Sequence, residues 1–164
     1  MTKNNYPLYS DEYFMAFAIE EAKKGIEREE IPVGCIIVIN NEIVARSHNM
    51  NRSKDCNLYH AEMIAISEAC ERLGRWSLLD ATMYVTLEPC IMCSGAIIQS
   101  RIKRLVYGSN ADRFDSCEYI LDAFNLKSNH KVDIKGGVLK EKIEKMMKKF
   151  FIDLRQNKKW GIYE

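Results

Sequence analysis

Residues 82–94 read TMYVTLEPCIMCS and combine a β-branched apolar run with a proline and two closely spaced cysteines. The run at 82–87 is typical of a buried strand. Pro89 then precedes a short helix predicted at 90–100, which Cys90 opens and whose first turn carries Cys93. The segment therefore predicts a strand followed directly by a helix, with a Cys-x-x-Cys pair at the helix start.

A second motif, His60-Ala61-Glu62, opens another helical pattern at 61–73 that Gly74 closes. Two facing helix N-termini can bring one imidazole and two thiols together, and helix N-termini favour the thiolate form. His60, Cys90 and Cys93 are therefore the candidate zinc ligands. Three protein ligands leave the fourth tetrahedral position for water, which is the pattern of a catalytic zinc site.

Glu62 follows the histidine by two positions, so its carboxylate is expected near the metal without being a ligand. Zinc lowers the pKa of a bound water towards ~7, and a nearby carboxylate can relay the proton. The simpler alternative is that Glu62 only stabilises the helix N-terminus. Beside the Cys-x-x-Cys pair, the proton shuttle is the favoured interpretation.

Two other interpretations of the cysteine pair are open. A closed structural zinc site needs a fourth protein ligand, and the candidates are Cys56, Cys117, His48 and His130. None of them belongs to a second ligand pair. A redox pair would not account for the His-Ala-Glu motif. The roles of Cys35, Cys56, Cys70 and Cys117 stay open, with a small buried hydrophobe as the default for each.

The rest of the chain alternates between helical and strand patterns. Ser10 caps a first helix that ends near Gly25. The sequence also predicts strands at 33–39, 42–47, 103–107 and 132–135, a tight turn at 40–41, a short helix at 118–124 and a C-terminal amphipathic helix at 139–158. This order predicts an α/β domain in which helices cover a mixed sheet.

The composition is that of one ordinary globular domain spanning 1–164, with a polar lead at 1–9 that we expect to be flexible. The formal net charge of +1 announces no nucleic-acid partner. Neither a membrane span nor the apolar core of a signal peptide is found, so we expect a cytoplasmic protein without membrane contact.

The pattern His-x-Glu followed by Pro-Cys-x-x-Cys is the signature of zinc-dependent nucleobase deaminases. Over most of its length the chain also resembles the bacterial tRNA adenosine deaminases. The stretches that carry this resemblance are 31–34 (IPVG), 60–62 (HAE), 82–98 (TMYVTLEPCIMCSGAII), 100–102 (SRI), 106–108 (VYG), 129–130 (NH), 137–139 (GVL) and parts of 150–155.

This resemblance implies a three-layer α/β/α cytidine deaminase-like fold with a mixed five-stranded sheet, one Zn²⁺ per chain and a homodimer. It implies hydrolysis of adenosine to inosine at the wobble position in the anticodon arm of tRNA, with Glu62 as the catalytic proton shuttle. The predicted substrate-binding residues are Asn49, Ala61 and Pro89, together with Tyr59, whose ring departs from the family pattern. Asn49 would hydrogen-bond the flipped base. The equal alternative is that Asn49 is only a turn residue in an Asn-rich loop.

The segment 140–159 carries eight Lys or Arg against three acidic residues, a local charge of +5. Such a face attracts phosphates. Together with the resemblance, it makes Lys148, Lys149, Phe151 and Arg155 candidate RNA contacts. The alternative is the solvated outer face of an amphipathic helix.

Three departures from the family pattern bear on the substrate. The loop at 109–119 lacks the usual glycines, which permit close backbone approach, and carries Asp115 and Glu118. Tyr59 stands where the family has a small residue, and its ring is expected to narrow the pocket or stack on a base, with a core residue as the alternative. Met50-Asn51 replaces a proline-containing turn. The alternatives are therefore a deaminase of a free nucleobase, nucleoside or modified purine, and a non-catalytic zinc-stabilised RNA-binding protein.

Overall fold

The computed structural model describes residues 5–111 and 130–157. Nine elements follow one another in this part of the chain: α1 (Asp11–Glu27), β1 (Gly34–Ile39), β2 (Glu42–His48), α2 (Ala61–Leu73), β3 (Thr82–Leu87), α3 (Ile91–Gln99), β4 (Arg104–Ser109), β5 (Asp133–Lys135) and α5 (Lys140–Asn157). No described helix is long and apolar enough to span a lipid bilayer.

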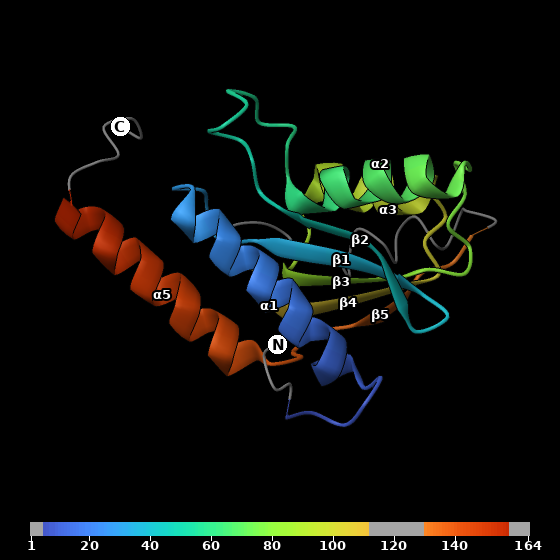
Figure 1. Ribbon diagram of the computed structural model, residues 1–164, viewed down its shortest axis with the longest axis horizontal. Coiled ribbons are helices and arrows are strands. Elements are labelled where there is room, and N and C mark those ends of the chain that lie inside the picture. The colour runs from blue at the N-terminus through green and yellow to red at the C-terminus, as the bar shows by residue number, and fades with distance from the viewer. Residues whose placement is uncertain (1–4, 112–129, 158–164) are drawn as a thin grey trace.

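The strands form one five-stranded sheet in the order β2-β1-β3-β4-β5 (Figure 1). β1 pairs antiparallel with both β2 and β3, whereas β3–β4 and β4–β5 are parallel pairs. The predicted mixed sheet is therefore confirmed. Because β3 and β4 are parallel, α3 is the crossover helix that connects them, and its N-terminus lies at the carboxyl end of β3.

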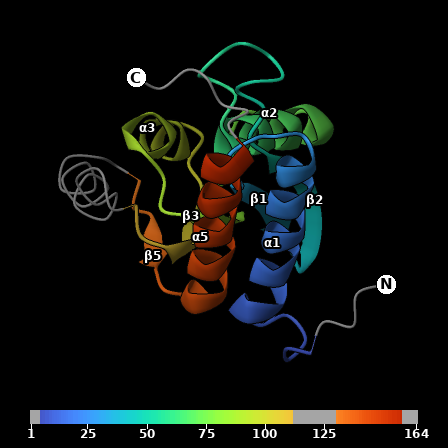
Figure 2. The same ribbon diagram turned by 90° about the vertical axis from the view of Figure 1, so that its left-hand side faces the viewer.

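Helices cover both faces of the sheet: α2 and α3 lie on one face, and α1 and α5 on the other (Figures 1 and 2). Alternate residues of β1 serve the two cores. Cys35 and Ile37 belong to the core under α2 and α3, and Ile36 and Val38 to the core under α1 and α5. A strand buried on both faces explains why the sequence shows a continuous apolar run instead of alternation. The three-layer α/β/α prediction is confirmed.

Two glycines allow the helices on the α1/α5 face to approach the sheet closely. A Cβ at Gly34 would collide with the backbone of Ala18 and Ala22 in α1. A Cβ at Gly108 would collide with the Ile143 side chain of α5 and with a backbone carbonyl. The strand predicted to end at residue 107 runs on to Ser109, so that end was wrong, because Gly108 lies inside β4, where it makes room for α5.

The predicted caps and turns are largely confirmed. The Ser10 hydroxyl accepts a hydrogen bond from the Tyr13 N–H at the start of α1, and Gly74 ends α2 in the left-handed conformation. Asn40 and Asn41 both have positive φ, as their hairpin turn requires. Leu139 also has a φ of 55°, so α5 begins one residue later than predicted.

Other predictions fall partly or wholly outside the described residues. These are the short helix at 118–124, most of the loop at 109–119, Lys158 at the end of the last helix and the first four residues of the polar lead. The end of that lead is folded in a turn, in which the Ser10 N–H donates to the Pro7 carbonyl over 3.1 Å.

Candidate zinc centre and active site

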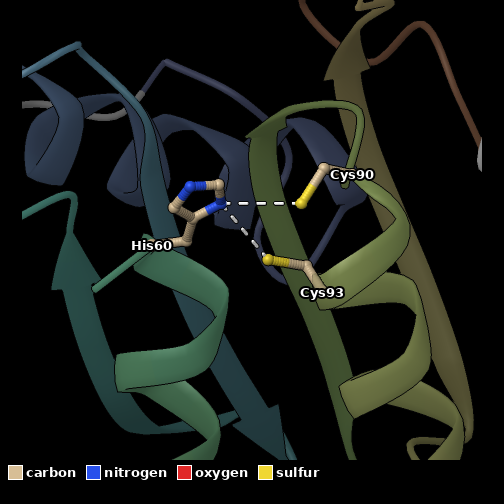
Figure 3. Close-up of side chains that lie close together, drawn as sticks. All are labelled: His60, Cys90 and Cys93. Atoms are coloured by element: carbon tan, nitrogen blue, oxygen red, sulfur yellow. Dashed lines mark hydrogen bonds between the residues drawn. The ribbon is translucent and has the colours of Figure 1, made fainter. Parts of the chain in front are cut away.

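His60, Cys90 and Cys93 meet where the N-termini of α2 and α3 face each other. His60 is the N-cap of α2, Cys90 is the N-cap of α3, and Cys93 lies in the first turn of α3. The Nδ1 atom of His60 lies 3.6 Å from the Cys90 Sγ and 3.5 Å from the Cys93 Sγ (Figure 3). The three residues that the sequence singled out as ligands therefore converge.

These distances fit a tetrahedral zinc ion. With Zn–S bonds of about 2.3 Å and a Zn–N bond of about 2.05 Å, tetrahedral geometry places a nitrogen ligand about 3.5 Å from each sulfur. The three ligand atoms of His60, Cys90 and Cys93 all lie within 4.8 Å of one another. One imidazole and two thiols form a donor set that suits zinc and leaves one tetrahedral position without a protein ligand.

The environment of Cys90 favours the thiolate that a metal needs. Hydrogen bonds lower the pKa of Cys90 to about 3, although burial opposes the shift. The largest contribution comes from the Cys93 thiol, and His60 contributes a smaller one. The Cys93 backbone N–H contributes to the same shift. This is the expected effect of free N–H groups at a helix N-terminus.

Glu62 lies in the first turn of α2 and is 3% exposed. Burial raises the pKa of its carboxyl group. The charge of His60 lowers this pKa and the charge of Cys90 raises it. Within the described part of the chain, its Oε2 atom is buried without a hydrogen-bond partner. A buried carboxyl group with a raised pKa and an unused oxygen, next to a metal-ligand cluster, suits a role in proton transfer.

Three of the predicted substrate-binding residues surround the start of α2. The Asn49 Oδ1 atom accepts a hydrogen bond from the Ala61 N–H over 2.8 Å, and both residues are buried. This contact leaves the two amide hydrogens of Asn49 to other partners. Tyr59 is 40% exposed, so it is not the core residue that was the alternative for its ring. Pro89 is buried directly before Cys90.

Two residues that no sequence motif indicates also organise this region, Ser47 and Glu30. The Ser47 hydroxyl donates to the Ala61 carbonyl over 2.6 Å, so the backbone between His60 and Glu62 is held by side chains on both of its polar groups. Glu30, 1% exposed, accepts three hydrogen bonds from the loop that precedes Tyr59. Its place in the charged run 27–30 (EREE) indicates a solvated residue, and no pattern in the sequence signals its burial.

The closed structural zinc site finds no fourth ligand in the described residues. His130 contacts the Ile102 carbonyl at 2.8 Å, and His48 lies 3.8 Å from the Glu21 carboxylate. Among the described residues, the one cluster that could hold a metal is His60, Cys90 and Cys93, and Cys56 is not part of it. Cys117 lies outside the described residues. Of the other cysteines, Cys35 is fully buried as expected, whereas Cys70 is half-buried.

The candidate RNA contacts lie apart from the zinc centre, on α5 in the other helical layer (Figure 2). Lys148, Lys149 and Arg155 are exposed, and Phe151 is 37% exposed. Lys149 forms an ion pair with Asp153 at 2.7 Å. The structure therefore presents these residues to solvent without bringing them to the metal ligands.

The chain is similar to known proteins in both sequence and structure. Residues 8–109 match the family described as "Cytidine and deoxycytidylate deaminase zinc-binding region". A tRNA-specific adenosine deaminase of Bacillus subtilis is 45% identical over 153 residues, which cover 91% of this chain and 93% of the relative.

Solved structures show the same fold. A structure from a study of A-to-I editing by tRNA:A34 deaminases has a TM-score of 0.76 at 36% identity, covering 82% of this chain and 98% of the other. A guanine deaminase from Nitrosomonas europaea has a TM-score of 0.77 at 22% identity, covering 90% and 88%. The second likeness concerns the fold alone. The chain belongs to the zinc-dependent cytidine and deoxycytidylate deaminase family, in the branch of the tRNA-specific adenosine deaminases.

Proposed function

We propose that this protein hydrolyses adenosine to inosine, with release of ammonia, at the wobble position of tRNA. The observation that carries the proposal is the convergence of one imidazole and two thiols, at zinc-ligand spacing, beside the buried Glu62 carboxyl group. The substrate follows from relatives that are named tRNA-specific adenosine deaminases and cover nearly the whole chain.

In the proposed reaction His60, Cys90 and Cys93 hold the zinc ion. When bound, zinc lowers the pKa of water towards ~7, so that water attacks at neutral pH. Glu62 takes a proton from the attacking water and delivers it to N1 of the adenine ring while the new C–O bond forms at C6. Glu62 then carries the second proton to the amino group, which leaves as ammonia. The unused Glu62 Oε2 and its raised pKa support this role.

Residues around the start of α2 serve the base in this proposal. Asn49 is fixed by the Ala61 N–H through its oxygen, so its amide hydrogens have a defined direction for hydrogen bonding to the base. The exposed Tyr59 ring can stack on a base, a contact that is tolerant of sequence. Ala61 and Pro89 are both buried and precede Glu62 and Cys90 directly in the chain, so we propose that they bound the base from below.

We also propose that α5 contacts the anticodon arm through Lys148, Lys149, Phe151 and Arg155, because phosphates are drawn to exposed cations.

We propose a cytoplasmic homodimer as well. Exposed apolar side chains beside the zinc centre, Leu58 at 61% and Ile91 at 72%, support coverage by a second copy. Light scattering then gives about 38 kDa, twice the 19.0 kDa chain, and a monomer mass contradicts the dimer.

The function is tested by offering the purified protein an anticodon stem-loop with adenosine at the wobble position, beside free adenine, guanine, cytosine and their nucleosides. Inosine in the RNA and ammonia release are measured. We expect inosine only in the stem-loop, and only at the wobble position. Turnover restricted to free bases or nucleosides contradicts the proposal and selects the small-substrate alternative. A matched stem-loop with guanosine at the wobble position is the control for non-specific deamination.

A further inference from the structure

A buried carboxylate outside the zinc centre binds the loop that leads into it. Glu30 lies three residues beyond the end of α1 and is 1% exposed. Its Oε1 atom accepts hydrogen bonds from the Ser53 N–H over 2.8 Å and from the Ser53 hydroxyl over 2.7 Å. Its Oε2 atom accepts from the Arg52 N–H over 3.1 Å. Both oxygens are therefore engaged by one short stretch of the loop.

This loop, residues 49–59, joins β2 to α2 and extends beyond the sheet (Figure 1). Within it the Lys54 N–H donates to the Met50 carbonyl and the Cys56 N–H to the Asn51 carbonyl, which makes a compact turn. The Met50 N–H donates to the Tyr59 carbonyl over 2.9 Å, so the two ends of the loop lie side by side. The residue before that closure is Asn49 and the residue after it is His60.

The carboxylate contacts N–H groups at the start of this turn, as a capping residue does at the start of a helix. Hydrogen bonds to an ionised acceptor are stronger than those between neutral groups, and a buried carboxylate is costly to leave without partners. Arg52 and Ser53 are themselves exposed, and their side chains bind the same short segment: the Arg52 guanidinium donates to the Glu29 carbonyl over 3.0 Å and the Ser53 hydroxyl donates to Glu30. The turn is therefore joined to residues 29–30, and Glu30 is the buried member of that segment and accepts both backbone N–H bonds.

We propose that Glu30 is a positioning residue for deamination. It fixes the turn at 50–56, and through the closed ends of the loop it sets the placement of Asn49 and Tyr59 against the substrate base. The proposal rests on the proposed function for its catalytic consequence. We call the three hydrogen bonds from Arg52 and Ser53 to Glu30 the clamp. The clamp is a property of the folded chain and can be tested without any substrate.

The test compares Glu30→Gln with Glu21→Gln. Glu21 is a carboxylate of similar burial, 3% exposed, that pairs with Lys24 at 2.7 Å and makes no hydrogen bond to the loop among those described. In Glu30→Gln one of the two oxygens becomes an NH₂ group. Because Arg52 and Ser53 donate to different oxygens, one of the two backbone donors then loses its acceptor.

Hydrogen–deuterium exchange is measured for the peptide covering residues 50–59, and zinc content and steady-state kinetics on the stem-loop are measured in parallel. We expect faster exchange in this peptide for Glu30→Gln only, with zinc retained. We also expect a loss in kcat/KM of roughly 10- to 100-fold, because displaced substrate contacts carry such costs. Ser53→Ala changes an exposed residue and removes one of the three hydrogen bonds, so a smaller change in the same direction is expected even if Glu30→Gln folds poorly.

If the exchange of the 50–59 peptide is unchanged in both Glu30→Gln and Ser53→Ala, the clamp is overturned. Faster exchange with a wild-type kcat/KM overturns the positioning role. An equal kinetic loss in Glu21→Gln shows a general stability effect and also overturns it. A wild-type protein that is inactive on every RNA overturns the proposed function, and the exchange measurement still decides whether Glu30 holds the loop.

Discussion

Asp11 connects the first turn of α1 to strands β3, β4 and β5, and its replacement by Asn should lower the free energy of unfolding. The Asp11 carboxylate receives a bidentate pair of hydrogen bonds from Arg104, at 2.7 and 3.0 Å. Lys135 donates over 2.7 Å and the Tyr84 hydroxyl over 3.1 Å. One carboxylate therefore links α1 with β3, β4 and β5.

The magnitude follows from the contacts and from the exposure of each side chain. Hydrogen bonds to charged groups contribute about 1.5–3 kcal/mol each where water is excluded. The Asp11 side chain is 12% exposed, but those of Arg104 and Lys135 are 27% and 49% exposed, so water offsets part of the loss. We expect Asp11→Asn to lower the free energy of unfolding by about 2 kcal/mol, which corresponds to a fall in Tm of about 4–8 °C.

The effect should depend on pH in a defined direction. Hydrogen bonds from Arg104 and Lys135, opposed by burial, hold the pKa of Asp11 well below its ordinary value of 3.8. The stabilisation is therefore complete above about pH 4 and is lost as the pH falls further towards the folded-state pKa. The variant has no carboxyl group to protonate, so the difference in Tm between the two proteins should narrow below about pH 4.

The assay is thermal unfolding followed by circular dichroism at pH 7 and at steps below pH 4. The matched control is Asp133→Asn, which breaks the 3.1 Å contact with Arg104 from a side chain that is 72% exposed. Such an exposed pair contributes about 0–1 kcal/mol. Equal melting temperatures for Asp11→Asn and wild type at pH 7, or equal losses in Asp11→Asn and its control, would refute the reasoning.

Three further predictions concern packing, metal and RNA. Gly34→Ala forces a Cβ into the α1 backbone at Ala18, so we expect a loss of roughly 3 kcal/mol in urea unfolding; a wild-type midpoint contradicts it. Cys93→Ser removes one of three ligands, so zinc content after dialysis should fall from one per chain towards zero, and full retention contradicts the ligand assignment. Replacing Lys148 and Lys149 by Ala should raise KM for the stem-loop and reduce the slope of log KM against log salt by about 1.4–1.8, which is about 0.7–0.9 for each phosphate contact; an unchanged slope removes α5 from the RNA interface.

Much of the fold and the metal site could be predicted because local signals agree with the tertiary arrangement. Residues 82–94 hold a strand, a connection and a helix start in one stretch, and His60 marks the other helix start. The position of the cysteines at helix N-termini therefore follows from sequence order alone. The two-sided burial of β1 was also predictable, since its continuous apolar run leaves no polar face.

Other features depend on contacts between distant segments, which a single sequence does not show. Glu30 belongs to a charged run that resembles a solvated helix end, and its partners lie more than twenty residues away. Gly108 suggests the end of a strand, but its function is to admit Ile143 of α5. Asn49 combines with Ala61 through a fold-dependent contact, so spacing alone left it indistinguishable from a turn residue.

The central claim is that three ligands hold zinc while Glu62 moves protons without binding the metal. It is tested most directly by measuring ammonia release and zinc content in Glu62→Ala, side by side with the wild type. Abolished turnover with one zinc still bound per chain is the predicted result. Loss of zinc together with activity, or turnover that survives the substitution, would contradict the account.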